Sequence, residues 1–539
     1  MLQKDKRRGN AGWKERLAGE KGVVQKKWGG RIPVAVVFPN SYHVGMSNLA
    51  FHILYRTLNE RDDVVCERFF YEEGMPLVSL ESSRPLSSFA ISFFTLSFEL
   101  DYPNIVKMFE QSSLPIFSGE CNDGTPLRVA GGICAMANPE PVSAFFDLFI
   151  LGDVEATLPQ FMDRFAASRD LNRNTIIAGL SALPFVYNPA ALSIRYREDG
   201  QIEAFGPPGF SVAVEHYSGE ALGTSAIISP DTEFGDMALI EGTRGCPSRC
   251  SFCLLGNIYR FRSEDTGKII GDAKDVGIIG GGISFHPHIV EIVENFRKQG
   301  VRVHLPSLRL DEVPIELIGL LKDDIKTLTF GIEAGTERLR TFLGKKITDD
   351  EIFSRIGAIM GLKSFNLKLY FMIGIPGETL ADIDAIPELV KRTRHVMIQH
   401  GAPRGSLGNI TIHVSPLVPK AATPFQWIPM EDMGGLKEKI KRLQAAFRKI
   451  DNTVFTHDSV KFSFLQAVLS RGDRRISDVI IRLAHGQSLN KIIRESSINL
   501  NFYALRERAP DEIFPWDFIA GPVSKKRLHD AFTKKAHLT

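Results

Sequence analysis

The sequence predicts an α/β protein with an N-terminal doubly wound, Rossmann-like domain, a central partial (β/α)6 barrel and a helical C-terminal region. Two series of strand-like apolar runs alternate with helical stretches, a proline-rich segment separates the series, and the pattern after Trp427 is helical. We therefore expect a basic arm at 1–31, the doubly wound domain at 32–170, a connector at 171–230, the barrel at 231–430 and the helical region at 431–539.

The first 31 residues carry ten lysines and arginines against three acidic residues. They contain no apolar segment and no small-residue cleavage site, so they do not form a secretory signal. This composition favours a solvated, loosely ordered arm, and contact with nucleic acid is the alternative.

The doubly wound domain begins with Ile32–Phe38, a valine-rich run that suits a strand covered on both faces. Further strand-like runs are Val64–Arg68, Phe89–Leu96, Pro115–Ser118, Arg128–Ala130 and Phe146–Leu151. Helical patterns lie at 49–58, Tyr102–Gln111 and Ala156–Ala167. Sheets of this kind bind ligands at the carboxyl ends of their strands.

The connector contains Pro184, Pro189, Pro207 and Pro208 and suits short strands, and a second βα series begins near Met237. Its strand-like runs are Ala238–Glu241, Val276–Ile279, Val301–Pro306, Thr327–Gly331, Lys368–Ile373 and Asn409–Val414. Six parallel strands would form an open barrel with its catalytic groups at their carboxyl ends. The helical region comprises Gly435–Ile450, Asp458–Leu469, Ile476–Ala484 and Leu489–Ile493.

The overall composition is that of a globular protein, with 44% hydrophobic and 24% charged residues and a formal net charge of +2. No stretch approaches 18 uninterrupted apolar residues, so no membrane span is predicted. The low cysteine content is typical of a reducing compartment, and we expect a cytoplasmic protein.

Three of the six cysteines lie close together, as Cys246, Cys250 and Cys253. The spacing C-x3-C-x2-C offers three thiolates to a 4Fe–4S cluster, one fewer than an electron-transfer cluster takes. The fourth iron is then open to a substrate or cofactor. The alternatives are a structural zinc knot or a chance grouping, but neither a second C-x2-C pair nor a His pair follows.

This triad, with Phe252 just before its last cysteine, resembles the radical S-adenosylmethionine (SAM) superfamily. The resemblance implies that the open iron chelates the methionine amino and carboxylate groups, and that an electron from the cluster cleaves SAM to a 5′-deoxyadenosyl radical. Residues 30–530 are similar to a subfamily with an N-terminal cobalamin-binding-like domain. The matching phrases are Pro39–Leu49, Asn138–Pro141, Gly331–Gly335, Ser415–Lys420, Thr423–Trp427, Arg471–Arg475 and Pro515–Asp517.

The resemblance implies a SAM site at the ends of successive barrel strands. Gly281 and Gly282 follow the second strand and let backbone approach the methionine amino group, although the family often has Gly-Gly-Glu there. Ser307 and Arg309 follow the third strand and share one face by strand alternation. Arg309 would pair with the methionine carboxylate. Its alternative role is a salt bridge to Asp311.

Three further positions complete the expected SAM site. Glu333 ends the fourth strand, and a carboxylate can accept hydrogen bonds from both ribose hydroxyls. Gly374 and Ile375 follow the fifth strand and would line the adenine. Phe252, within the cysteine loop, is expected to lie beside the cofactor as well.

The resemblance implies cobalamin as an additional cofactor if the first domain retains the cobalamin-binding role of its relatives. The cobalamin motif Asp-x-His-x-x-Gly would fall in the first βα loop, where Ser41–Met46 keeps His43, lacks the aspartate and has the glycine displaced. His43 is thus a candidate cobalt ligand, with a capped loop residue as the alternative.

The function that follows is a radical SAM enzyme acting on a substrate that the sequence does not identify. A reductase such as flavodoxin or ferredoxin is the expected electron donor. The alternatives are a cobalamin-dependent radical SAM methyltransferase, a tRNA methylthiotransferase-like enzyme and a non-catalytic scaffold that carries a cluster. The methylthiotransferase needs a second cluster, whereas Cys66, Cys121 and Cys134 suit buried apolar positions.

Overall fold

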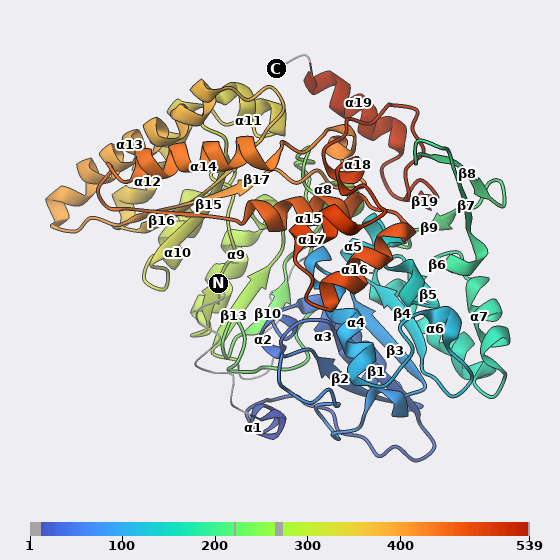
Figure 1. Ribbon diagram of the computed structural model, residues 1–539. Coiled ribbons are helices and arrows are strands. Elements are labelled where there is room, and N and C mark those ends of the chain that lie inside the picture. The colour runs from blue at the N-terminus through green and yellow to red at the C-terminus, as the bar shows by residue number, and fades with distance from the viewer. Residues whose placement is uncertain (1–11, 220–222, 265–272, 537–539) are drawn as a thin grey trace. The chain divides into compact units, whose positions relative to one another are not determined.

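The computed structural model describes residues 12–219, 223–264 and 273–536 (Figure 1). The chain forms two compact units. The first unit comprises the chain up to Ile240, Asp473–Glu495 and Ile513–Gly521, and the second comprises Glu241–Gly472, Ser496–Glu512 and the chain from Pro522 on. Both units contain parallel strands joined by helices, which confirms the predicted α/β class.

The sheet of the first unit has the strand order β2-β1-β3-β4-β5-β6. Its strands are β1 (Ile32–Phe38), β2 (Val64–Phe70), β3 (Ile91–Thr95), β4 (Leu127–Gly131), β5 (Leu148–Ile150) and β6 (Val186–Tyr187). The first five are parallel, and β6 runs antiparallel to β5. Strand order reverses beside β1, so the chain leaves β1 and β3 in opposite directions at their carboxyl ends.

Helices connect these strands and pack on the sheet (Figure 1). They are α2 (Tyr42–Gly45), α3 (Leu49–Asn59), α4 (Tyr102–Gln111), α5 (Ile133–Ala137), α6 (Val154–Ser168) and α7 (Arg173–Ser181). The connector then forms the short strands β7 (Ser193–Tyr196), β8 (Ile202–Gly206) and β9 (Val212–Ala213), as predicted.

The strand predicted at Pro115–Ser118 is wrong. Residues 115–117 belong to no strand, and a 3-10 helix covers Ser118–Glu120. The carbonyl groups of Pro115 and Ile116 accept hydrogen bonds from the buried guanidinium of Arg128, at 2.5 and 3.1 Å. A side chain on β4 thus occupies the backbone acceptors that a neighbouring strand would use.

The prediction of a loosely ordered basic arm is also wrong for its described part, and residues 1–11 lie outside the described residues. Helix α1 (Trp13–Ala18) places Trp13 in the core of the first unit, 6.4 Å from the ring of Phe70. Glu20 forms an ion pair with Arg68 at 2.6 Å, and both side chains are fully buried. Apolar and charged anchors far along the chain therefore hold this segment.

C-terminal segments complete the first unit. Helices α16 (Ser477–Ala484) and α17 (Leu489–Glu495) belong to it, and β19 (Ile519–Ala520) pairs with β9. Arg474, just before α16, donates to Glu140 at 2.8 Å, and Glu140 is fully buried. An ion pair therefore joins two of the sequence segments that carry the resemblance, Asn138–Pro141 and Arg471–Arg475.

The second unit contains two groups of parallel strands. Strand β10 (Ala238–Glu241) carries the chain from the first unit into the second, where Gly242 donates its N–H to Ile279. β13 (Asp275–Ile279) pairs with β14 (Arg302–His304), and a separate sheet has the order β15-β16-β17-β18. The strands of this sheet are β15 (Thr327–Glu333), β16 (Asn366–Ile373), β17 (Ile410–Pro416) and β18 (Thr453–His457).

The seventh strand of this series corrects the prediction that the chain is helical after Trp427. β18 pairs in parallel with β17 from Ile410/Thr453 to Val414/His457. Phe447 stacks on Phe455, with ring centroids 5.4 Å apart, and thereby ties β18 to the helix before it. Phe455 is thus the apolar anchor of a strand whose other residues are mostly polar.

Helices cover one side of the β15–β18 sheet (Figure 1). The helices of the second unit are α8 (Leu255–Ile258), α9 (Ile289–Lys298), α10 (Ile315–Leu321), α11 (Glu337–Leu343), α12 (Asp349–Leu362), α13 (Leu380–Gly401), α14 (Met433–Phe447), α15 (Val460–Arg471), α18 (Leu500–Ala504) and α19 (Lys525–Ala536). Within the described part of the chain, no helix has the length and apolarity needed to span a bilayer.

Candidate SAM and cluster site

The cysteine loop follows β11 (Thr243–Arg244), which pairs antiparallel with β12 (Arg262–Ser263) and so closes the loop at its base. Gly245 begins the turn with φ +74°, and a Cβ atom there would lie 2.9 Å from the carbonyl oxygen of Arg260. Only glycine tolerates both the backbone conformation and this close approach.

A buried asparagine fixes the inside of the loop. Asn257, in α8, donates from Nδ2 to the carbonyl oxygens of Cys253 at 2.7 Å and Cys250 at 3.4 Å. The N–H of Cys253 also donates to the carbonyl oxygen of Cys250 at 3.2 Å. The backbone that carries two of the three thiols is thus held from within.

Neighbouring elements of the second unit fix the outside of the loop through Ser251. Its N–H donates to Leu343 at the end of α11, and its carbonyl accepts from Phe425. Lys535 of α19 donates from Nζ to Ser251 Oγ at 2.8 Å. Asn257 and Lys535 could not be recognised from the sequence as partners of the loop, because neither is part of a recognisable motif.

The environment of the thiols fits a cluster. Burial raises the pKa of Cys250, while the nearby cations Lys345 and Arg309 oppose that rise. Burial raises the pKa of Cys253 to about 11, against hydrogen bonds from the N–H groups of Leu255 and Gly256. Cations and N–H donors aimed at sulfur are what stabilise metal-bound thiolates.

Among residues 12–219, 223–264 and 273–536, no three His, Cys, Asp or Glu side chains converge as the ligands of one metal ion do. A 4Fe–4S cluster makes a different demand, because each cysteine binds a separate iron. The three free cysteines of one loop, with Cys250 buried and the other two half-buried, meet that demand.

The glycine run after β13 packs directly on this loop. A Cβ atom at Gly280 would lie 2.1 Å from Thr243 Oγ1, and one at Gly282 would lie 2.8 Å from the Phe261 ring. A Cβ at Gly281 would meet Leu255. The glycines therefore have a packing role beside the cysteine loop in addition to the predicted role in binding SAM.

The third strand brings Arg309 to the cysteine loop. Arg309 Nη1 donates to Cys250 Sγ at 3.7 Å, while the rest of the guanidinium binds both carboxylate oxygens of Asp311. The alternative role of Arg309, a salt bridge to Asp311, is thus present in the structure, and its pairing with the methionine carboxylate stays a prediction. Ser307 is exposed and lines a cavity of about 320 Å³ together with Asp324 and Thr329.

Glu333 occupies an unusual position at the end of β15. Its φ is +73°, and the register with β16 shifts between Gly331 and Glu333. Lys345 Nζ lies 2.9 Å from Glu333 Oε1 and also donates to the carbonyl oxygen of Gly331 at 2.9 Å. Lys345 is a buried cation that sequence reasoning missed, because its partners lie on another element.

The last predicted residues border an apolar cluster. Ile375 belongs to it with Phe342, Met372 and Phe425, and Phe252 packs against its edge. Gly374 has φ +81° and donates its N–H to Glu378 at 2.8 Å. Burial raises the pKa of Glu378, and Lys439 binds its carboxylate at 2.7 Å.

His43, the candidate cobalt ligand, lies in α2 of the first unit. Its Nδ1 is 3.3 Å from Asp231 and its Nε2 is 3.5 Å from Glu233. Both ring nitrogens therefore face carboxylates, and neither is directed at an open space for a metal. This environment does not fit a histidine that ligates cobalt.

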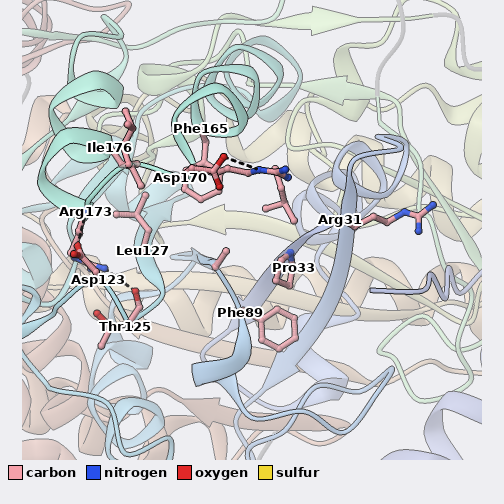
Figure 2. A pocket seen from close by; sticks show the side chains of 15 residues that line it. Arg31, Pro33, Phe89, Asp123, Thr125, Leu127, Phe165, Asp170, Arg173 and Ile176 are labelled. Atoms are coloured by element: carbon pink, nitrogen blue, oxygen red, sulfur yellow. Dashed lines mark hydrogen bonds and ion pairs between the residues drawn. The ribbon is translucent and has the colours of Figure 1, made fainter. Parts of the chain in front are cut away.

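A cavity of about 280 Å³ in the first unit lies at the opposite edge of its sheet (Figure 2). Pro33, Phe89 and Leu127 mark the amino ends of three strands around it, and Arg173 and Asp123 line one side. None of the predicted site residues contributes to this cavity. Ligands of parallel sheets bind at the carboxyl edge, so this cavity is not part of the predicted site.

Comparisons with known proteins agree with the family resemblance that the cysteine loop indicates. Residues 50–189 match the family described as radical SAM proteins, N-terminal, and residues 240–390 match the radical SAM superfamily. An uncharacterized protein of Methanocaldococcus jannaschii is 30% identical over 457 residues, which cover 82% of this chain and 89% of that protein.

More distant relatives match part of the chain. The ribosomal protein uS12 methylthiotransferase RimO of a Thermoanaerobacter species is 22% identical over 29% of this chain and 41% of its own length. The solved structure of the cobalamin-dependent SAM radical enzyme OxsB, with aqua-cobalamin and SAM bound, is 12% identical with a TM-score of 0.45, over 94% of this chain and 79% of that one. Together with the cysteine loop, the matches in both units show that the chain belongs to the radical SAM superfamily, whose cofactors are a 4Fe–4S cluster and SAM.

Proposed function

We propose that this radical SAM enzyme holds its cluster on Cys246, Cys250 and Cys253 and acts on its substrate through a 5′-deoxyadenosyl radical. The observation that supports this most is a convergence at Cys250. Arg309 contacts its sulfur at 3.7 Å, and its thiol also lies within the electrostatic influence of Lys345 and Glu333. Charged side chains that follow β14 and β15 thus act on one cysteine.

Each side chain at this point has a role that fits its chemistry. When bound, a cluster with one open iron supplies the electron that cleaves SAM. Arg309 would bind the methionine carboxylate, because its guanidinium already forms a fork with a carboxylate at Asp311. Glu333 would accept hydrogen bonds from the ribose hydroxyls, while the ion pair with Lys345 orients its carboxylate.

We also infer the finer architecture that this function requires. The first unit would be a Rossmann-like domain, since its strand order 2-1-3-4-5 is that of one doubly wound class. The second unit would be a partial barrel in which β13 to β17 deliver the SAM-binding residues at their carboxyl ends. Radical SAM enzymes need a reductant, and a flavodoxin or ferredoxin is the donor that we propose.

Electron paramagnetic resonance of anaerobically reconstituted, reduced protein tests this function. We expect a 4Fe–4S signal that changes when SAM is added, and that is lost in Cys250→Ala. A cluster signal that ignores SAM would favour a structural cluster in a scaffold. The absence of any cluster signal would overturn the proposal.

A cobalamin-dependent methyltransferase is a second candidate, favoured by two exposed apolar side chains at the carboxyl edge of the first sheet. Val44, after β1, is 41% exposed, and Phe98, after β3, is 42% exposed. They flank the point where strand order reverses, where doubly wound sheets bind cofactors. Titration with hydroxocobalamin, followed by its visible spectrum, tests this. We expect any binding to survive His43→Ala, because His43 faces two carboxylates.

A methylthiotransferase finds less support in the first unit. Such an enzyme needs a second cluster, but Cys66 is buried within β2, and burial raises its pKa well above the usual range. Cys134 is buried in α5, and Cys121 is partly exposed. The proposed radical enzyme therefore rests on one cluster.

A further inference from the structure

One side of the β15–β18 sheet is polar, and the other is apolar. Leu328, Leu369 and Ile412 represent the apolar side, where alternate residues of β15 to β17 are buried beneath helices. The residues between them point the opposite way and are only partly buried. We call this side the polar face; its members are Thr329, Lys368, Tyr370, Thr411, His413, Ser415 and Thr456.

Strand register places these side chains in rows. Lys368 pairs with Thr329 on one side and Thr411 on the other. Tyr370 pairs with His413, and their rings lie 5.2 Å apart at 65°. The polar face therefore continues across three strands toward Glu333 at the carboxyl end of β15.

A hydrogen-bonded network fixes one end of the polar face. His413 Nε2 lies 3.2 Å from Asp458, and Ser415 donates to the same carboxylate at 2.6 Å. His413 Nδ1 lies 2.9 Å from Thr456 Oγ1, whose own proton is donated to the carbonyl oxygen of Ile412. Both ring nitrogens of His413 therefore have a polar partner on the same side of the sheet.

Hydrogen bonds to His413 and Ser415 lower the pKa of Asp458, although burial opposes this. The Asp458 carboxylate is therefore held by two members of the polar face. Lys345 and Glu333 form an ion pair at the end of β15. The polar face itself contains one ammonium cation.

Lys368 is that cation. Its ammonium lies 5.0 Å from the centroid of the Tyr370 ring, and among the described residues no carboxylate lies within ion-pair distance of it. The side chain is partly buried between two threonines. A cation withdrawn from water without a counterion is costly unless a ligand supplies the negative charge.

We propose that the polar face binds the substrate, and that Lys368 recognises an anionic group on it, a carboxylate or a phosphate. Thr329 and Thr411 are the cross-strand neighbours of Lys368 on the same face, and their hydroxyl groups can donate to the same anion. Tyr370, held against His413, would form the side of the site that receives the rest of the substrate. This inference rests on the proposed function, because it adds a substrate class to the same enzyme.

Anion binding to the reconstituted enzyme tests the proposal. The probes are inorganic phosphate, followed by its ³¹P line width, and ¹³C-labelled acetate, followed by its carboxyl line width. SAM is present without reductant, so that Arg309 is already occupied. Binding of phosphate alone would identify a phosphate site, and binding of acetate alone a carboxylate site.

Lys368→Met should weaken binding of that anion by about tenfold or more, because a charge-assisted hydrogen bond is lost. Lys368→Arg should retain most of it. Lys461→Met, at an exposed lysine of α15, is the matched control and should leave binding unchanged. Equal binding by wild type and Lys368→Met, or no binding of either probe to the wild type, would overturn the proposal.

The cluster signal and its response to SAM separate this outcome from a failure of the proposed function. Lys368→Met should retain both, which also shows that the variant is folded. If the cluster or the SAM response is missing from the wild type, the proposed function fails, whether or not phosphate or acetate binds.

Discussion

Lys345 Nζ lies 2.9 Å from Glu333 Oε1, and this ion pair holds the side chain of a residue whose backbone conformation is rare for glutamate. The φ of Glu333 is +73°, a conformation that costs on the order of 1–3 kcal/mol for such a residue. Lys345 donates its second hydrogen bond to Gly331, at the same irregularity of β15. The pair therefore maintains a strained carboxylate at the end of a strand.

Glu333→Gln should weaken SAM binding by about tenfold, because a neutral amide accepts more weakly than a carboxylate from ribose hydroxyls. Calorimetric titration of the reconstituted protein with SAM measures this. Glu316→Gln, at an exposed glutamate of α10, should bind SAM like the wild type.

Glu333→Gly separates the strain from the ligand role. Both Glu333→Gly and Glu333→Ala leave the buried ammonium of Lys345 without its carboxylate, but the glycine variant should have the higher free energy of unfolding by about 1 kcal/mol, because glycine adopts a positive φ without cost. SAM binding should fall in both variants as in Glu333→Gln. Urea denaturation gives the first quantity. A glycine variant with full SAM affinity would contradict the ribose role.

Cys250→Ala should reduce bound iron and sulfide to near zero, because two thiolates cannot retain a cluster that three hold. Iron analysis after anaerobic reconstitution measures this. Cys134→Ala removes another buried cysteine, in α5 of the first unit, and should keep its full iron content. Equal loss in both variants would indicate a folding defect instead of a lost ligand.

Arg68→Met should lower the free energy of unfolding of the first unit by about 3–5 kcal/mol. Arg68 lies between Glu20 and Glu81, at 2.6 Å from each, and all three side chains are almost completely buried. The substitution leaves two carboxylates without a counterion. Adding Glu20→Gln and Glu81→Gln to Arg68→Met should recover much of the loss, as measured by urea denaturation.

The contribution of Asp101 to the free energy of unfolding of the first unit should decrease as the pH rises from about 4 to 7. Burial, with Glu99 nearby, raises the pKa of Asp101 from 3.8 to about 7, although Asn40 donates to its carboxylate. The folded state therefore binds the proton more tightly than the unfolded state, so this contribution to stability is present at low pH and is lost as the pH approaches 7.

Asp101→Asn removes this titration and should flatten the stability profile between pH 4 and 7. The stability of the variant relative to the wild type should be greatest at pH 8, where the wild-type carboxylate is ionised and buried. Urea midpoints of both proteins at pH 5 and pH 8 measure the difference. A wild type and variant that change equally between these pH values would contradict the assignment.

Strand positions could be predicted where the local sequence alone decides them. β1 has the predicted limits Ile32–Phe38, because an apolar run that is buried on both faces needs no further information. β18 was missed, since Thr453–His457 is largely polar and is held by Phe447 and by pairing with β17. The run at Pro115–Ser118 has a strand-like composition, but Arg128 takes its backbone acceptors.

In the candidate site, too, local sequence decides some features and contacts between elements decide others. The cysteine spacing and Glu333 are visible in the sequence because chemistry fixes the types of residue. Lys345 and Asn257 act through contacts that arise only once α11 and α8 are in place. Arg309 has two partners, Cys250 and Asp311, and no sequence pattern shows that a single guanidinium contacts both.

The return of Asp473–Glu495 and Ile513–Gly521 to the first unit has a consequence for synthesis on the ribosome. Glu140 is fully buried, and Arg474, which binds it, is made more than 300 residues later. At about 5–20 residues per second, that interval is roughly 15–70 s. In the nascent first unit Tyr187 can already donate to Glu140, but its carboxylate lacks its cationic partner until the second unit is nearly complete, and chaperones have that time in which to bind the unit.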